Sequence, residues 1–246
     1  GHESQIRAPG DFVQAFMCET PIILSRGQDG DIYANINSCS HRGLPVCRAD
    51  HGNTKRFVCP YHNWSYSVEG NLMTIPQESE VVRKPDKTQL GLKRVPRVES
   101  WRGMIFGSFD EAIISLDDYL GDMRFYLDAF FDRFPAGIEF MGAPHRWVIN
   151  ANWKLPVENQ LGDVNHGACL HSAIIPAEAQ QLIEKLGHSV VTTPGHGATF
   201  RLMPENTPVD DVAWGMEAVG AIFGGDEVQN YLREIQAQAR ERVGDL

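Results

Sequence analysis

The chain has 246 residues, of which 42% are hydrophobic and 22% charged, and its formal net charge is −10. This composition is that of a globular protein with enough apolar residues to bury a core. It contains no run of about 18–20 uncharged apolar residues, which excludes a membrane-spanning helix, and its acidity argues against nucleic-acid binding. Five cysteines are too few for a disulfide scaffold, and no charged and apolar leader begins the sequence. We therefore expect a cytoplasmic protein.

Short strands joined by turns are expected up to about residue 110, because β-prone runs alternate with turn-forming residues. Gly27–Gly30 predicts a hairpin turn between the first two runs. From about residue 115 the pattern changes, and apolar residues at every third or fourth position up to residue 130 predict an amphipathic helix. A strand over 145–149 and a polar surface helix over 226–243 follow. The β-prone runs are residues 21–26, 32–37, 56–59, 64–68 and 72–75.

Residues 42–102 depart from the acidic balance of the chain. They carry eleven basic and six acidic side chains, so this stretch has a charge of +5 and the remainder −15. A basic stretch of this kind is either a solvated surface or a docking face for an acidic partner.

Two Cys-His pairs, Cys39-Ser40-His41 and Cys59-Pro60-Tyr61-His62, form the first motif. Each pair lies at a turn between predicted strands and can place its sulfur on one iron and its imidazole on another. Two thiolates and two imidazoles are the ligands of a Rieske [2Fe–2S] centre. A tetrahedral Cys2His2 zinc site is the alternative, although zinc motifs generally pair Cys with Cys and His with His.

The segment Cys39-Ser40-His41-Arg42-Gly43, followed after His41 by seventeen residues and then Cys59-Pro60-Tyr61-His62, resembles the Rieske motif of aromatic-ring-hydroxylating oxygenases, large (α) subunit. This resemblance implies that Cys39, His41, Cys59 and His62 hold the cluster. One position departs from the motif, because Asn63 stands where the family usually has glycine.

The second motif is Asp163-Val164-Asn165-His166-Gly167-Ala168-Cys169-Leu170-His171. On one helix Asp163 and His166 would share a face, whereas His166 and His171 would not. The helix must therefore bend or end between the histidines, and Gly167 is the expected break. Two histidines presented in this way, together with a distant carboxylate, match the facial triad of non-haem Fe(II) oxygenases.

The same family resemblance extends to this motif and implies a role for each matching residue. His166 and His171 would bind a mononuclear Fe(II), Asn159 would lie beside it, and Asp163 would link it to a Rieske histidine of the neighbouring subunit in a homotrimer. Gln160 and Asn165 depart from the residues usual in the family. The family supplies the third iron ligand as an Asp much farther along, and the remaining acids lack its surroundings, so we interpret the chain as a fragment truncated at both ends. Those acids are Asp210, Asp211, Asp226 and Asp245.

The resemblance implies an α+β protein with an all-β Rieske [2Fe–2S] domain over 1–112. Part of an α+β helix-grip (START-like) catalytic domain would follow over 113–246. The function implied is the terminal oxygenase of a multicomponent system that hydroxylates an aromatic small molecule with O2. Electrons would come from a ferredoxin or reductase, and the α subunits would assemble with or without a β subunit. A Rieske electron-transfer protein without hydroxylase activity is the alternative.

An iron assay tests the interpretation as a fragment. Because two imidazoles without a carboxylate bind Fe(II) weakly, we expect the 246 residues alone to assemble the Rieske cluster, hold little mononuclear iron and hydroxylate no aromatic. Stoichiometric mononuclear iron with hydroxylated product, in the presence of ferredoxin, reductase and NADH, would show that one of the four acids completes the triad.

Overall fold

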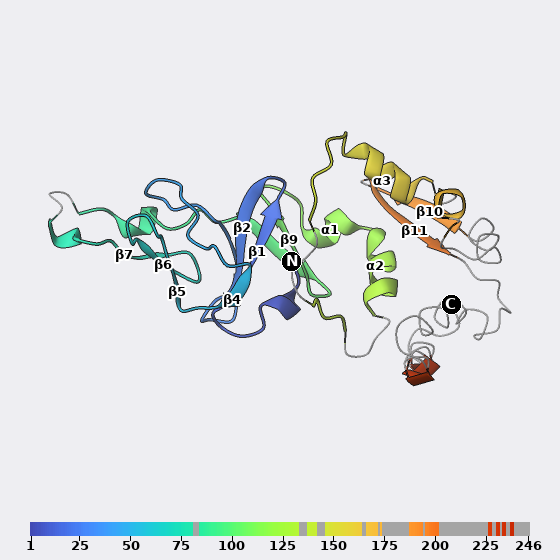
Figure 1. Ribbon diagram of the computed structural model, residues 1–246, viewed down its shortest axis with the longest axis horizontal. Coiled ribbons are helices and arrows are strands. Elements are labelled where there is room, and N and C mark those ends of the chain that lie inside the picture. The colour runs from blue at the N-terminus through green and yellow to red at the C-terminus, as the bar shows by residue number, and fades with distance from the viewer. Residues whose placement is uncertain are drawn as a thin grey trace. The chain divides into compact units, whose positions relative to one another are not determined.

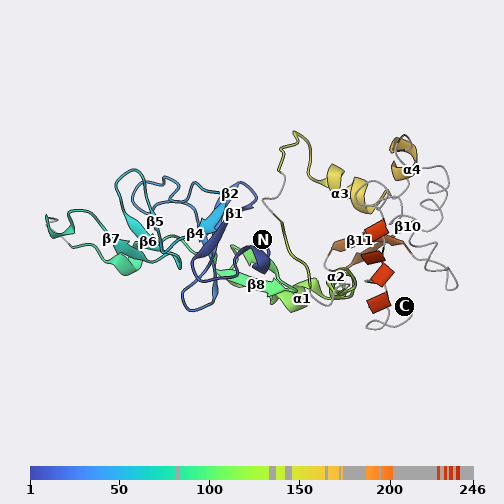
Figure 2. The same ribbon diagram turned by 60° about the horizontal axis from the view of Figure 1, so that its bottom comes forward.

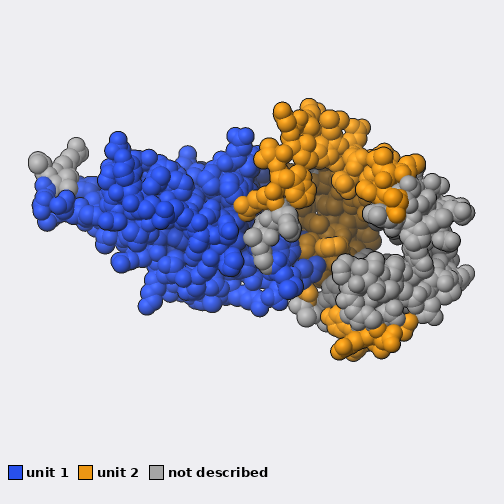
Figure 3. All heavy atoms as spheres, viewed as in Figure 1, with its two compact units in different colours: residues 1–116, 138–145 blue, residues 117–137, 146–246 orange. Residues whose placement is uncertain are grey.

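The structure is a computed structural model of the chain. It forms two compact units, residues 1–116 with 138–145 and residues 117–137 with 146–246 (Figure 3). The domain boundary after residue 112 stays a prediction. The structure describes residues 1–80, 84–132, 137–141, 146–163, 166–171, 173, 187–193, 195–201, 226–227, 230–231, 233–234 and 237–238.

A four-stranded antiparallel sheet forms the centre of the first unit, in the order β3–β2–β1–β4. Figure 1 labels β1, β2 and β4 of this sheet. The predicted hairpin around Gly27–Gly30 is confirmed, since it joins β2 to β3 and the Gly27 N–H donates to the Asp31 carbonyl (2.8 Å). The strands are β1 (Asp11–Met17), β2 (Thr20–Arg26), β3 (Ile32–Ile36) and β4 (His51–Asn53).

Two smaller antiparallel sheets complete the first unit. β5–β6–β7 form one sheet, which confirms the three shorter β-prone runs, and β8 and β9 form a hairpin. The β5–β7 sheet lies at the opposite end of the unit from β8 (Figure 2). The strands are β5 (Arg56–Val58), β6 (Ser65–Ser67), β7 (Leu72–Thr74), β8 (Arg97–Trp101) and β9 (Met104–Ser108), and single-turn helices cover 3–5, 78–80 and 87–89.

The central sheet separates two hydrophobic cores, because successive side chains of a strand point to opposite faces. On β2, Ile22 and Leu24 enter one core, and Ile23 between them enters the other. On β1, Phe12 and Val13 divide in the same way. The core that receives Ile23 and Phe12 also contains Cys39 and Cys59, together with Val46, Cys47, Phe57, Tyr66, Val68, Leu72 and Leu92.

Among the described residues, the second unit contains four helices with defined bounds, one hairpin and further helical residues between 226 and 238. The single helix expected over 116–130 is wrong, because the chain forms two helices separated at Gly121, whose left-handed φ of +48° ends the first. Residues 146–149 form no strand, so a β-prone run alone did not decide their structure. The elements are α1 (Leu116–Leu120), α2 (Met123–Phe131), α3 (Lys154–Leu161), α4 (His166–Leu170), β10 (Gly187–Thr192) and β11 (His196–Arg201).

The Thr199 side chain joins the β10–β11 hairpin to α3. The Thr199 hydroxyl on β11 donates to the Gln160 carbonyl (2.9 Å) near the end of α3. The described residues between 226 and 238 are helical and exposed, in agreement with the expected polar helix. Among the described residues, no helix combines the length and the apolarity that crossing a bilayer requires.

The turn between β6 and β7 depends on Gly70, which has a φ of +94°. A Cβ added there would lie 2.4 Å from the side-chain oxygen of buried Asn35. The Gly70 carbonyl also accepts from the Leu92 N–H (2.7 Å), so the turn cannot move without losing this bond. Both the backbone conformation and the lack of space therefore require glycine.

We predict that Gly70→Ala lowers the free energy of unfolding by about 2–4 kcal/mol, because left-handed strain and a steric clash add together. Gly30→Ala is the matched control, since Gly30 has a φ of +89° with no atom within 4 Å of the added Cβ. The control should cost only about 1–2 kcal/mol. Urea unfolding followed by circular dichroism measures both, and equal losses would contradict the clash.

Candidate metal centres

Two loops of the first unit bring the four predicted cluster ligands together. Cys39 and Cys59 are 3% and 2% exposed in the same core. The imidazole rings of His41 and His62 lie with their centroids 4.6 Å apart. His41 is exposed and His62 half-buried, so the sulfurs face the core and the imidazoles lie nearer solvent.

The two loops share one pattern of backbone hydrogen bonds. In each, the cysteine N–H donates to the carbonyl five residues later, and the cysteine carbonyl accepts from the N–H four residues later. The two loops therefore present cysteine and histidine from equivalent turns. The bonds are Cys39 to Leu44 (2.9 Å) and Gly43 to Cys39 (2.7 Å) in the first loop, and Cys59 to Trp64 (2.8 Å) and Asn63 to Cys59 (2.9 Å) in the second.

This shared turn explains the unusual residue at position 63. Gly43 has a φ of +79° and Asn63, at the equivalent position of the second loop, a φ of +58°. After glycine, asparagine is among the residues that adopt this left-handed conformation most readily. Asn63 therefore keeps the turn although it replaces the glycine of the family motif.

Each histidine ring stacks on an aromatic side chain of the second loop. His41 lies on Trp64 with centroids 4.8 Å apart, and His62 lies on Tyr61 at 3.8 Å. The Arg42 guanidinium in turn lies 5.5 Å from the centre of the Tyr61 ring. These contacts restrict the orientation of both imidazoles. Sequence spacing did not identify them, because stacking depends on how the two loops pack.

A tyrosine hydroxyl reaches the sulfur of the first loop. Tyr66 on β6 is fully buried, and its hydroxyl lies 3.1 Å from Cys39 Sγ. The same oxygen accepts from the Ser40 N–H (3.2 Å). Because a cysteine that binds iron carries no hydrogen, the Tyr66 O–H would donate to Sγ. Burial, reinforced by the bond to Cys39, raises the pKa of Tyr66, so the hydroxyl keeps its proton.

The residues present fit a Rieske cluster. His62 Nδ1 is buried without a hydrogen-bond partner, so it has a free position for a metal bond. Burial, followed by the charges of His41 and Arg42, lowers the pKa of His62 and favours the neutral imidazole that binds metals. Among the described residues, no three His, Cys, Asp or Glu side chains converge on one point.

The second motif brings together Asn159, His166 and His171. The rings of His166 and His171 lie 5.6 Å apart, and the Asn159 amide nitrogen lies 3.4 Å from His166 Nε2. His166 Nδ1 lies 2.5 Å from the Asp163 carbonyl, which can only accept, so Nδ1 carries the hydrogen and Nε2 the lone pair. A metal-binding histidine commonly donates its other N–H to a carbonyl in this way.

The helical interpretation of this motif needs two corrections. Asp163 lies outside any helix, after α3 has ended at Leu161, and its carboxylate accepts from the His166 N–H (3.0 Å) near the start of α4. Gly167 lies inside α4, which ends at Leu170, so the helix stops directly before His171. The reason is that a single glycine weakens a helix without breaking it.

The third iron ligand is not identified among the described residues. Asp226 is exposed in a helical segment, and the described residues contain no group of three side chains suited to one metal ion. Asp210, Asp211 and Asp245 lie outside the described residues.

Comparison with known proteins places these motifs in a family. Residues 1–96 match the Rieske [2Fe-2S] domain. The whole chain is 36% identical to the benzene 1,2-dioxygenase α subunit of Pseudomonas putida and 42% identical to the naphthalene 1,2-dioxygenase large oxygenase component of Pseudomonas fluorescens, covering 54% of each. A crystal structure of a naphthalene 1,2-dioxygenase variant bound to phenanthrene matches 99% of the chain with a TM-score of 0.80, at 33% identity and over 55% of its own length.

The chain thus spans about half the length of the curated relatives it matches. The match covers both motifs, including the loops that hold Cys39 and Cys59 and the segment from Asn159 to His171. The chain therefore contains a Rieske [2Fe-2S] domain and is homologous over its whole length to the large oxygenase subunits of the benzene and naphthalene dioxygenases.

Proposed function

We propose that this chain is part of a terminal oxygenase component that hydroxylates an aromatic ring with O2. The observation that carries the proposal is the meeting of two equivalent Cys-His loops over one buried core. Cys39, His41, Cys59 and His62 would hold a [2Fe–2S] cluster, which supplies one-electron transfer when bound. Similarity to oxygenase subunits favours this function over that of an electron-transfer protein without hydroxylase activity.

The residues around the loops would hold the cluster in a fixed environment. Trp64 and Tyr61 orient the imidazoles, and the core of Phe12, Ile23 and their neighbours excludes water from the sulfurs. The Tyr66 hydroxyl directs its hydrogen toward Cys39 Sγ. A hydrogen bond to a cluster sulfur favours the reduced, more negative form and thereby raises the reduction potential.

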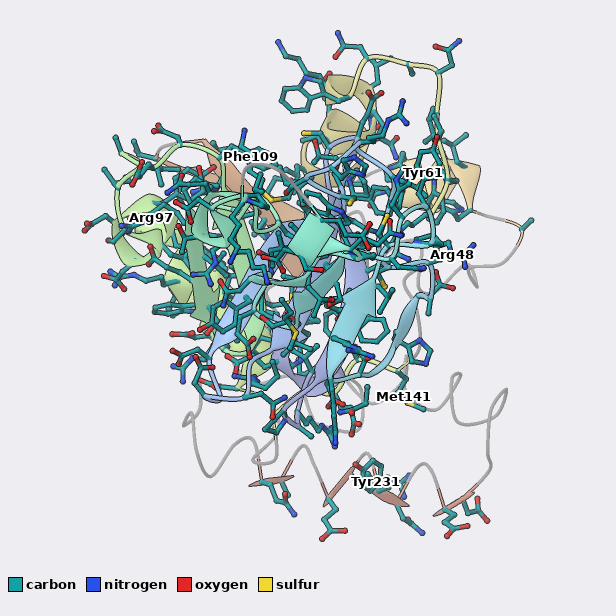
Figure 4. The ribbon with its side chains drawn as sticks, turned by 90° about the vertical axis from the view of Figure 1, so that its left-hand side faces the viewer. Arg48, Tyr61, Arg97, Phe109, Met141 and Tyr231 are labelled. Carbon is teal, nitrogen blue, oxygen red and sulfur yellow. The ribbon has the colours of Figure 1, made fainter. Side chains whose placement is uncertain are left out.

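A ferredoxin or reductase would supply the electrons. Arg42 and Arg48 are exposed, and Figure 4 shows Arg48 and Tyr61 on the same side of the first unit. The positive charges of Arg42 and Arg48 suit the acidic surface of a small electron carrier, because opposite electrostatic potentials steer the encounter of two proteins. These residues favour the docking-face interpretation of the basic stretch.

Together with a mononuclear iron, His166, His171 and Asn159 would form the second metal centre. When bound, this iron would supply the site at which O2 reacts. His166 offers Nε2 and is oriented by its bond to the Asp163 carbonyl. We propose that Asp163 connects this centre to a Rieske histidine of a neighbouring α subunit in a trimer, with an aromatic molecule as the substrate.

Histidine variants test the proposed cluster. We expect the dithionite-reduced protein to show a Rieske EPR spectrum, and His41→Ala and His62→Ala to abolish it, because each removes one of two nitrogen ligands. His51→Ala is the matched control, since His51 is an exposed residue of β4 in the same unit. An unchanged spectrum in either ligand variant would refute the assignment.

Tyr66→Phe tests the hydrogen bond to the cluster. We expect this variant to lower the reduction potential of the cluster by about 40 mV. This shift corresponds to the loss of a hydrogen bond worth about 1 kcal/mol in a one-electron couple. The potential is measured by an EPR-monitored redox titration. Tyr33→Phe is the control, because the Tyr33 hydroxyl bonds the exposed Asp29 (2.5 Å) and not a cysteine. Equal shifts in the two variants would contradict the role of Tyr66.

A further inference from the structure

The two cluster loops are closed in different ways. The second loop is a hairpin, because Val58 at the end of β5 pairs with Ser65 at the start of β6. The first loop begins directly after β3 ends at Ile36, but residues 44–50 on its far side form no strand. Paired strands therefore close the second loop, whereas the first loop, which has an equivalent backbone turn, has no such pair.

The Asn37 side chain closes the first loop. Its Oδ1 accepts from the N–H groups of Val46 (2.9 Å) and Cys47 (3.0 Å), and its Nδ2 donates to the Cys47 carbonyl (2.7 Å). Asn37 is 3% exposed, so water does not compete for these bonds. Its own N–H donates to the Pro21 carbonyl (2.9 Å), which attaches the residue to the start of β2.

A neutral amide makes this full set of bonds without a buried charge, whereas an ionised carboxylate cannot. Oδ1 faces two donors and Nδ2 faces an acceptor, so the network also determines which side-chain atom is oxygen and which is nitrogen. An aspartate could accept both N–H groups but could not donate to Cys47, and its charge would be buried. The amide binds the N–H and carbonyl of Cys47 as a neighbouring strand would.

We propose that Asn37 is a positioning residue that replaces the missing strand pair and holds the loop carrying Cys39 and His41 in place for the cluster. This inference rests on the proposed function for its link to the cluster. The closure of the first loop by the Asn37 side chain rests on the hydrogen bonds alone. Without the amide, the far end of the loop loses three bonds while the second loop keeps its ladder, so the first loop should open independently.

Two measurements on the purified 246-residue chain test this inference. Hydrogen–deuterium exchange of peptides spanning 38–47 reports opening of the loop, whatever the metal content of the protein. Release of iron to a chelator reports loss of the cluster. We expect Asn37→Ala to increase both rates about tenfold or more, because three buried hydrogen bonds are lost. Asn37→Asp, which keeps the two accepted bonds, should lie between Asn37→Ala and wild type.

Two control variants separate the loss of the Asn37 hydrogen bonds from a general loss of stability. Val46→Ala removes buried apolar volume from the same loop while leaving the Val46 N–H bond in place. Asn35→Ala makes the same substitution at a buried asparagine whose Oδ1 has no hydrogen-bond partner. Both variants should change the rate of hydrogen–deuterium exchange in 38–47 and the rate of iron release by less than about threefold, even where they lower the melting temperature.

The outcomes are distinguishable. Exchange and iron release that rise no more in Asn37→Ala than in Val46→Ala would overturn the inference. If the wild-type protein gives no Rieske spectrum, the proposed function fails, and exchange in 38–47 still decides whether Asn37 closes the loop. Faster exchange with unchanged iron release would also overturn the proposed role, because the loop would then open without affecting the cluster.

Discussion

Burial of Cys39 and Cys59 in one hydrophobic core is the constraint on which the candidate centre depends. Both sulfurs are held on the same face of the central sheet by the alternation of β1 and β2, which sends Phe12 and Ile23 to that face. Because the sulfurs are buried, the histidines that follow two and three residues later emerge toward the surface. The separation between buried sulfur and more accessible imidazole therefore belongs to the shared turn, because all four residues lie outside the strands.

The shared turn shows how two unrelated sequences can produce one geometry. Gly43 and Asn63 adopt the same left-handed conformation, yet the loops are closed by an amide side chain in one case and by a strand pair in the other. Two matching turns need equally rigid ends, and the buried Asn37 side chain, hydrogen-bonded to Val46 and Cys47, would supply this rigidity at the start of the first loop.

Among the described residues of the second unit, local hydrogen bonds orient His166. His166 is oriented by a local bond to the Asp163 carbonyl and by Asn159 on α3, and α3 is itself joined to β11 through Thr199. These contacts span short stretches of sequence apart from the Thr199 bond. The candidate mononuclear centre is thus defined by neighbouring turns, whereas the candidate cluster centre is defined by a core assembled from residues 12 to 92.

The sequence by itself determined the candidate ligands and the hairpin between β2 and β3, because Cys-x-His, Cys-x-x-His and Gly27–Gly30 are local patterns with few chemical interpretations. It did not determine the break at Gly121, the end of α4 at Leu170 or the absence of a strand over 146–149. At these positions packing and strand pairing override local propensity. Only the tertiary structure placed the Tyr66 hydroxyl beside Cys39 and the Asn37 amide across residues 46–47. The first contact crosses 27 positions and the second crosses 10, and no periodic pattern encodes such distances.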